Sequence, residues 1–434
     1  MDKLKKNNID YKDDIVKLLG EWVNIPSIYD ESTKSITKPF GEGINKALKW
    51  FETLGKNNGF KVGNVDNHAV YIEYGSGDEC IDIFGHCDVV DVCDGWQYDP
   101  FSLTINKDKL IGRGVSDNKG PMIACFLALK SIKDKGIKLN RKVRLIVGGD
   151  EETGFRCIRQ YYKKEKYGVF GFTPDGKFPV LNGEKGAGII DLHFKIEDVK
   201  IKVNGGSIHN TIPNNITISG LEKMDNIIIN GKGGHSSKPE KAVNPIPKTF
   251  LYLYKTYNMH WANYMYKIFN ESNIDGNIFG INKVGKCGSL SIVPTIISIE
   301  EGRVRLTISV RFPENIKFNE IIEGIQNYFN KTDKKINIIG KEIKKANYID
   351  EESLLVKKLH EIYMKYTKDI SNKIRVTNAG SYASEMRNAV IFGCEFLDGS
   401  SGNVHMCNEY ASLEKLNLAI CIYKEAMITL CNDI

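Results

Sequence analysis

The sequence predicts an α/β domain with a mixed central sheet flanked by helices, interrupted by an inserted α+β domain. Short apolar runs alternate with helical segments in the first part of the chain, and this pattern changes between residues 189 and 346. The length of 434 residues is also too great for one compact core, so more than one domain is expected.

The first domain is expected to begin with helices and to continue with buried strands. Apolar residues recur at helical spacing up to about residue 54. Short apolar runs follow at 69–74, 80–84 and 143–147, and such runs are typical of strands that are buried on both faces. A helical segment at 121–133 separates two of them, which gives the alternation of an α/β domain.

The middle of the chain has a different pattern. A strand at 304–310 is followed by a helix at 318–329, and Asn and Lys are plentiful there. A strand at 389–392 and a final helix at 413–430 then return to the earlier pattern, so the first domain is expected to close with the C-terminal segment. The expected boundaries are 1–188 and 347–434 for the first domain and 189–346 for the insert.

Composition excludes several classes of protein. The 60 basic and 54 acidic residues give a net charge of +6, which is mild for this length, and no dense basic block suggests nucleic acid as a partner. No apolar run is long enough to span a membrane. The ten cysteines are scattered and no signal peptide precedes them, so we expect free thiols and a cytoplasmic location.

Five polar residues attract attention because of where they fall. They lie after apolar runs or in crowded turns, and each has an ordinary reading as a helix cap, a turn or a solvated residue. Together they supply two histidines and three carboxylates, a mixture of N and O donors that suits Zn²⁺, Mn²⁺ or Co²⁺. The five candidate metal ligands are His86, Asp117, Glu152, Asp175 and His405.

The neighbours of these residues indicate further roles. A histidine at a strand end can bind a metal through one ring nitrogen, while Asp88 holds the other N–H and fixes the orientation of the ring. An aspartate can bridge two cations with its two oxygens. Of two adjacent glutamates, one can bind metal while the other, here Glu151, acts as a general base.

In their order, these motifs resemble those of a known enzyme family. The segments "GHCDVVDVCDGWQYDPF", "GRGVSDNKGP", "VGGDEETG", "FTPDGKFPVLNGEKG" and "NEYASLE" are similar to co-catalytic metallopeptidases, which include bacterial dipeptidases of the PepV type, aminoacylases and succinyl-diaminopimelate desuccinylases. The resemblance covers most of the chain before the insert and much of the segment after it. The Pro-Asp turn followed by "NGEKG" is closer to the dipeptidase branch than to the acylases.

The resemblance implies a role for each residue of the candidate metal site. One metal would be held by His86 and Asp175, and the other by Glu152 and His405. Asp117 would bridge the two metals. Glu151 would be the general base and acid, and Asp88 would orient the first histidine.

The resemblance also implies substrate contacts in the insert, which would form a lid. In "GGHSSKP", His235 would polarise the scissile carbonyl, and in "GGSIHNTIP", Asn210 would contact the substrate. In "SVRFP", Arg311 would clamp the substrate carboxylate, because a guanidinium pairs with a carboxylate through two hydrogen bonds.

One segment departs from the family pattern. The family usually has Gly-Gly-Thr-Tyr-Ala-Arg where this chain has Ala-Gly-Ser-Tyr-Ala-Ser. Gly380 and Ser381 are retained as expected substrate contacts, but Ser384 stands in place of the arginine. This departure affects substrate preference and removes no expected metal ligand.

The sequence therefore predicts a dipeptidase that holds two divalent metal ions, zinc with manganese or cobalt as alternatives, and cleaves dipeptides with a free C-terminal carboxylate. An N-acyl amino acid deacylase or a carboxypeptidase of the same family is the nearest alternative, and a non-catalytic metal-binding protein is the alternative from another class. The expected partners are small peptide substrates, with no nucleic acid and no membrane. The chain is expected to be a monomer or a homodimer.

Overall fold

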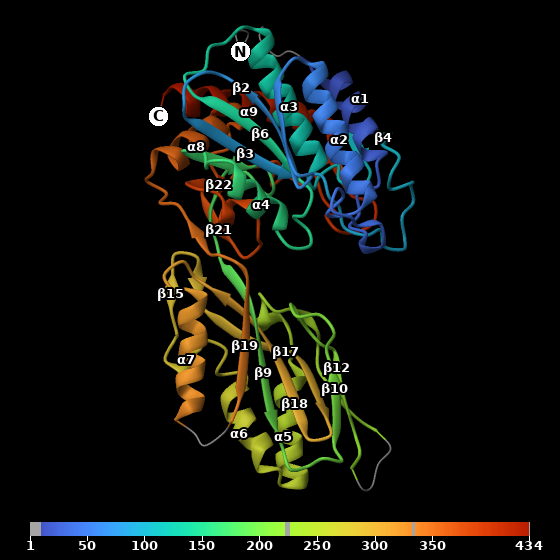
Figure 1. Ribbon diagram of the computed structural model, residues 1–434, viewed down its shortest axis with the longest axis vertical. Coiled ribbons are helices and arrows are strands. Elements are labelled where there is room, and N and C mark those ends of the chain that lie inside the picture. The colour runs from blue at the N-terminus through green and yellow to red at the C-terminus, as the bar shows by residue number, and fades with distance from the viewer. Residues whose placement is uncertain (1–9, 222–225, 332–334, 434) are drawn as a thin grey trace. The chain divides into compact units, whose positions relative to one another are not determined.

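The computed structural model describes residues 10–221, 226–331 and 335–433, which form two compact units (Figure 1). The first unit contains the described residues up to Asn182 together with Ile349–Val376 and the segment from Ser381 onward. The second unit contains Gly183–Tyr348 and Thr377–Gly380. Each unit has its own hydrophobic core, and the insert predicted at 189–346 lies within the second unit.

The first unit contains helices and strands in alternation. Its helices are α1 (Lys12–Val23), α2 (Glu42–Asn57), α3 (Lys119–Asp134), α4 (Arg156–Lys164), α8 (Leu354–Thr367) and α9 (Leu413–Asn432). Its strands are β1 (Lys61–Val65), β2 (Ala69–Tyr74), β3 (Cys80–His86), β4 (Thr104–Asn106), β5 (Lys109–Ile111), β6 (Lys142–Gly148), β7 (Phe170–Thr173), β22 (Ala389–Ile391) and β23 (Tyr410–Ser412). Two further strands, β8 (Leu181–Glu184) and β21 (Arg375–Thr377), have residues in both units.

The central sheet of the first unit is mixed, which confirms the predicted fold class. Its strands follow the order β1-β2-β6-β3-β7-β22-β8. The pairs β6–β3, β3–β7 and β7–β22 are parallel, whereas β1–β2, β2–β6 and β22–β8 are antiparallel. The C-terminal strand β22 therefore lies between two strands from the first half of the chain.

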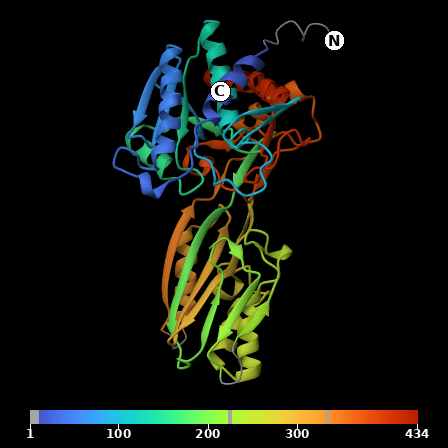
Figure 2. The same ribbon diagram turned by 90° about the vertical axis from the view of Figure 1, so that its right-hand side faces the viewer.

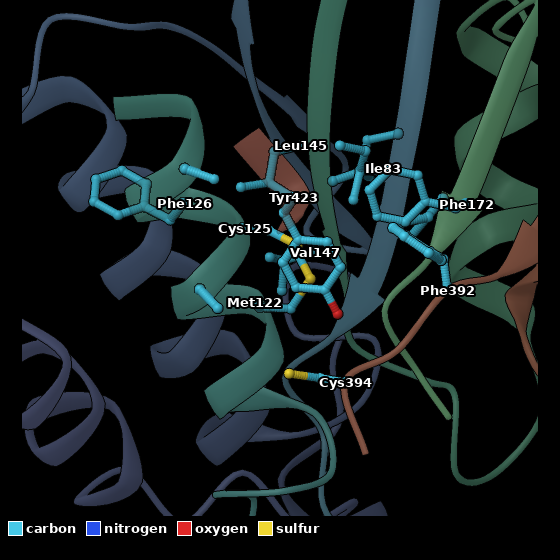
Figure 3. Packing of buried hydrophobic residues seen from close by; sticks show 14 of the residues in the cluster. Ile83, Met122, Cys125, Phe126, Leu145, Val147, Phe172, Phe392, Cys394 and Tyr423 are labelled. Carbon is cyan, nitrogen blue, oxygen red and sulfur yellow. The ribbon is translucent and has the colours of Figure 1, made fainter. Parts of the chain in front are cut away.

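Helices cover both faces of this sheet. On one face, α3 and α9 pack against β3, β6 and β7, and Figure 3 shows Met122 and Tyr423 from these helices beside Ile83 and Phe172. On the other face, Tyr161 of α4 packs edge-on against Phe84 at 5.4 Å between ring centroids. The strands are thus buried on both sides, which explains why their sequences are continuously apolar.

The described residues of the second unit form one large sheet and three α-helices, together with smaller elements. Its helices are α5 (Pro245–Tyr257), α6 (His260–Phe269) and α7 (Phe318–Asn330). Its strands are β9 (Gly186–Lys195), β10 (Lys202–Gly205), β11 (Thr211–Ile212), β12 (Asn215–Ser219), β13 (Ile227–Asn230), β14 (Gly234–His235), β15 (Val284–Gly285), β16 (Gly288–Ser289), β17 (Ser291–Glu300), β18 (Arg303–Phe312), β19 (Asn337–Lys344) and β20 (Asn347–Tyr348).

The large sheet of the second unit has seven strands in the order β13-β12-β10-β17-β18-β9-β19. A strand such as β12 alternates between buried and more exposed residues, because only one face of the sheet packs against helices (Figure 2). Ile308 and Leu306 on that face pack in one core with Phe250 of α5, Ile268 of α6 and Ile325 of α7. This α+β architecture agrees with the predicted inserted domain.

One helical prediction was too broad. The segment up to residue 54 was expected to be helical, but it forms two helices, α1 and α2, separated by residues 24–41. Pro26 and Pro39 fall in this connection, and proline lacks the N–H that a continuous helix needs. Within the described ranges, every helix is too short or too polar to cross a membrane.

Candidate metal centre

Three predicted ligands lie at one edge of the first unit's sheet because three neighbouring strands end there. β6, β3 and β7 are adjacent and parallel, so their carboxyl ends meet at the same edge, where ligands commonly bind in such sheets. His86 is the last residue of β3. Glu152 follows β6, and Asp175 follows β7 directly after a proline.

The other two predicted ligands are brought to this edge by loops. Asp117 lies in the loop between β5 and α3. His405 lies in the loop before β23, and β23 pairs antiparallel with β5, with Tyr410 opposite Ile111. This pairing places the C-terminal loop beside the Asp117 loop, although nearly 300 residues separate them in the chain.

The five side chains converge around Asp117. Its Oδ1 lies 3.0 Å from Nε2 of His86, and its Oδ2 lies 3.0 Å from Nε2 of His405. Oδ2 of Asp175 is 3.7 Å from Nε2 of His86, and Oε1 of Glu152 is 3.1 Å from Nε2 of His405. The structure therefore contains two sets of donors that share one aspartate.

The electrostatics of this cluster favour positive charge. Hydrogen bonds to Asp117 and Glu152 raise the pKa of His405 to about 11. Burial alone would lower the pKa of His86, but contacts with Asp117 and Asp175 outweigh it and raise that pKa well above its usual range. Burial, followed by the charge of Asp117, raises the pKa of Glu152 to about 7. Three carboxylates lie close together here, so they attract positive charge. Without another cation at this place, protons on the histidines and on Glu152 supply that charge.

The residues behind the ligands fix their positions. Nδ1 of His86 lies 2.9 Å from the backbone oxygen of Asp88, which is closer than the 3.5 Å to Oδ1 of the same residue. Oδ2 of Asp88 accepts a hydrogen bond from the backbone N–H of Glu152 at 3.0 Å. Asn118 accepts from the N–H of His86 and donates to the oxygen of Pro174. These hydrogen bonds connect the carboxyl ends of β3, β6 and β7 and the segments that follow them, where three of the candidate ligands lie.

Glu151 differs from its neighbour Glu152. It makes no hydrogen bond or ion pair with any residue that the structure describes, although a carboxylate oxygen lies within 4.8 Å of donor atoms of His86 and Asp175. Burial, followed by the charge of Asp175, raises the pKa of Glu151 well above its usual range. A carboxyl group with a raised pKa beside a cation site is suited to accepting and returning a proton.

The segment that departs from the family pattern lies at the boundary between the units. Gly380 belongs to the second unit and Ser381 to the first. The hydroxyl of Ser384 donates to the backbone oxygen of Ser381 at 3.0 Å, so the residue in place of the arginine is buried and bonded locally. Tyr382 is fully buried, with its ring centroid 6.3 Å from that of His86.

The other predicted substrate contacts lie in the second unit. Asn210 directly precedes β11, which pairs with β14 so that Thr211 lies opposite His235. Arg311 lies near the end of β18 and is largely buried, yet it makes no hydrogen bond or ion pair with a described residue. After burial, the charge of Arg311 is the main influence that lowers the pKa of His235. Arg311 is therefore a charged side chain without an acidic partner among the described residues, and it keeps the nearby ring of His235 neutral.

Sequence reasoning gave no role to two residues beside the ligands. Asn118, described above, joins three ligand loops, and Glu409 accepts hydrogen bonds from the loop of Asp117. Both lie within the quoted motifs, but an asparagine at a helix start and a glutamate before a strand are common without any special role. Only the three-dimensional contacts distinguish them.

The donor set fits divalent metal ions. Two neutral imidazoles and three carboxylates are ligands that Zn²⁺, Mn²⁺ and Co²⁺ accept. The nitrogen and oxygen atoms of His86, Asp117 and Glu152 all lie within 4.8 Å of one another, so one ion could contact them together. The raised pKa values of both histidines show that positive charge is favoured at this place.

Comparison with known proteins agrees with this geometry. Residues 83–429 match the model of peptidase family M20/M25/M40. A protein of Staphylococcus epidermidis assigned as a dipeptidase is 29% identical over 473 residues, covering 98% of this chain and 99% of its own. Two solved structures share the fold with TM-scores of 0.60 at 17% identity. They are human carnosine dipeptidase 1, with 97% of each chain covered, and a metallo-carboxypeptidase of Sulfolobus solfataricus, with 95% and 98% covered.

The matched segment contains every candidate ligand and most of the chain. The protein therefore belongs to peptidase family M20/M25/M40 and is a metallopeptidase. This confirms the family expected from the sequence motifs.

Proposed function

We propose that this protein is a dipeptidase that uses two divalent metal ions, Zn²⁺ or alternatively Mn²⁺ or Co²⁺. The observation that carries the proposal is the position of Asp117, whose two carboxylate oxygens each lie 3.0 Å from a different histidine. An aspartate in this position can bridge two cations. His86 and Asp175 would hold one ion, and Glu152 and His405 the other.

The bound ions would supply Lewis acidity, which makes water acidic enough to act as a nucleophile at neutral pH. The chain's own residues would manage the protons. Glu151 has no competing hydrogen bond among the described residues, so it is free to take a proton from the attacking water and pass it to the leaving amine. Asp88 would keep the ring of His86 in the tautomer that presents Nε2 to the metal.

Dipeptides are proposed as the substrates for two reasons. The relative from Staphylococcus epidermidis, which matches nearly the whole chain, is assigned as a dipeptidase. In addition, Arg311 is a largely buried guanidinium with no acidic partner among the described residues, and a carboxylate is the group that such a side chain binds best. It would bind the free carboxylate of the substrate, while His235, Asn210, Gly380 and Ser381 would contact the rest.

The ten cysteines are all free thiols in the structure, which supports a cytoplasmic location as part of the proposal. Cytoplasmic dipeptides are small products of protein breakdown. No nucleic acid or membrane takes part in this function, and the protein would act on peptides as a monomer or a homodimer.

The test is hydrolysis by metal-stripped protein that is then refilled with Zn²⁺, Mn²⁺ or Co²⁺. Dipeptides, tripeptides and N-acetyl amino acids are offered side by side. Metal-dependent cleavage confined to dipeptides is the expected result. Cleavage of N-acetyl amino acids instead would make the protein a deacylase with the same site, and cleavage of longer peptides would make it a carboxypeptidase or tripeptidase.

A further inference from the structure

A buried carboxylate accepts hydrogen bonds from the backbone of the loop that contains Asp117. Glu409 is 1% exposed, and its Oε1 accepts hydrogen bonds from the backbone N–H groups of Ser116 at 2.9 Å and Asp117 at 3.1 Å. The N–H of Gly114 is 3.2 Å from both of its carboxylate oxygens. Three N–H groups of one short loop thus point at one side chain. Hydrogen bonds to a charged acceptor are stronger than those between neutral groups.

This carboxylate is itself held by a buried guanidinium. Nη1 of Arg113 lies 2.9 Å from Oε2 of Glu409, and Arg113 is 1% exposed. Nη2 of Arg113 donates to the backbone oxygen of Asp91 at 3.2 Å, and the guanidinium lies 5.3 Å from the ring centroid of Trp96. These contacts with Asp91 and Trp96 hold the guanidinium in place, so that it stays beside Glu409 and offsets its charge.

The same residue connects the two loops that meet at the metal centre. Glu409 lies four positions after His405, and its backbone oxygen accepts from the N–H of Gly112 at 3.1 Å. Its side chain then holds the N–H of Asp117. Any displacement of Glu409 would consequently move Asp117 relative to His405, whose side chains now lie 3.0 Å apart.

We propose that Glu409, paired with Arg113, is a positioning residue that sets Asp117 against His405 and so determines how tightly the site binds metal. This inference rests on the proposed metal site. Residues that orient metal ligands typically alter metal affinity about 10–100-fold when they are replaced. The N–H of Asp117 is a direct partner of Glu409, so an effect in this range is expected.

The first unit offers a matched control in a second buried acid–arginine pair. Oδ1 of Asp82 lies 2.7 Å from Nη2 of Arg144, and both residues are at most 3% exposed. The other oxygen of Asp82 accepts from the hydroxyl of Tyr162 and from the N–H of Gly168. None of these partners is a candidate ligand, so loss of this pair should affect stability and leave metal binding unchanged.

The experiment measures cobalt binding by the metal-stripped full chain. Unmodified protein, Glu409→Gln, Glu409→Asp and Asp82→Asn are titrated with Co²⁺, and visible absorption reports both the affinity and the coordination geometry. Circular dichroism checks that each variant is folded, and thermal unfolding without metal measures its stability. The Gln variant removes the charge, whereas the Asp variant keeps the charge and withdraws the carboxylate from the loop by one methylene.

We expect Glu409→Gln to bind Co²⁺ about tenfold more weakly or worse, with an altered spectrum, and Glu409→Asp to fall between it and the unmodified protein. Asp82→Asn should bind Co²⁺ within about twofold of the affinity of the unmodified protein. This should hold even if its unfolding temperature falls as much as that of the Glu409 variants. If Glu409→Gln does not fold, the Co²⁺ affinity of Glu409→Asp tests the inference in its place.

Affinities for Glu409→Gln and Glu409→Asp within twofold of the unmodified protein would overturn the inference. An equal loss in Asp82→Asn would also overturn it, because the effect would then be general destabilisation. Absence of cobalt binding by the unmodified protein would instead overturn the proposed function, on which this inference rests. Failure of the inference and failure of the function are thus distinguished.

Discussion

Replacing Glu151 with glutamine should abolish most of the turnover while the proposed metal ions remain bound. The change is nearly isosteric and removes only the ability to accept a proton. Glu151 makes no hydrogen bond with described residues, so the substitution breaks no contact that holds the ligands. The adjacent Glu152, in contrast, lies 3.1 Å from the ring of His405.

The magnitude follows from the role. A positioned general acid–base group contributes about 10²–10⁴-fold to the rate, which corresponds to about 2.7–5.4 kcal/mol in the activation free energy. Because the Lewis acidity of the metals and the substrate contacts remain, residual metal-dependent activity should persist. The Michaelis constant should change little, since Glu151 acts in the transition state rather than on the bound substrate.

The assay compares Glu151→Gln with Glu152→Gln, a matched change at the next residue. Steady-state hydrolysis of a dipeptide gives kcat and KM, and elemental analysis after gel filtration gives the metal content per chain. Glu151→Gln should keep the metal content of the unmodified protein. Glu152→Gln should lose metal together with activity, because its carboxylate belongs to the donor set around His405.

Loss of metal from Glu151→Gln would refute this reasoning. The carboxylate of Glu151 lies in a group with His86 and Asp175 that could hold an ion, so it would then be a ligand in place of a base. Full activity with full metal content would refute it in another way, because proton transfer would then belong to a different group.

Three further changes test the structure elsewhere. Arg144→Met should lower the free energy of unfolding by about 3–5 kcal/mol in urea titrations, because it leaves a buried carboxylate unpaired. Gly85→Ala should cost about 1–3 kcal/mol in the same assay, since its Cβ would lie 2.3 Å from Oδ1 of Asn118. Arg311→Met should raise the activation free energy for kcat/KM with dipeptides by about 1.5–3 kcal/mol, whereas Arg305→Met on the same strand should not. Equal effects of the two changes would contradict the role of Arg311 in binding the substrate carboxylate.

Much of the fold follows from local sequence patterns. The apolar run at 69–74 coincides with β2, and the segment at 318–329 is one residue shorter than α7. These predictions succeed because a strand buried on both faces or a helix with one apolar stripe leaves a pattern in neighbouring residues. Residues 24–41 form no α-helix, because prolines interrupt a stretch for which apolar spacing alone had suggested one.

The pairing of distant segments does not follow from such patterns. Nothing local indicates that β22 lies between β7 and β8, or that β23 pairs with β5, because these pairings depend on the whole sheet. The five candidate ligands could be proposed because together they supply two histidines and three carboxylates, in ordered motifs that resemble those of a metallopeptidase family. Glu409 could not, since its importance lies in backbone N–H groups that carry no sequence signature.

The insertion of β22 between strands made much earlier has a consequence for synthesis on the ribosome. Chains emerge from the N-terminus, so β3, β6 and β7 are available well before residues 389–391 can join them. Until then, β7 presents an open edge, and the cluster around Asp117 lacks His405. A nascent chain, or a product of interrupted translation that ends in the second unit, would therefore lack His405, one of the proposed metal ligands, and is expected to be inactive.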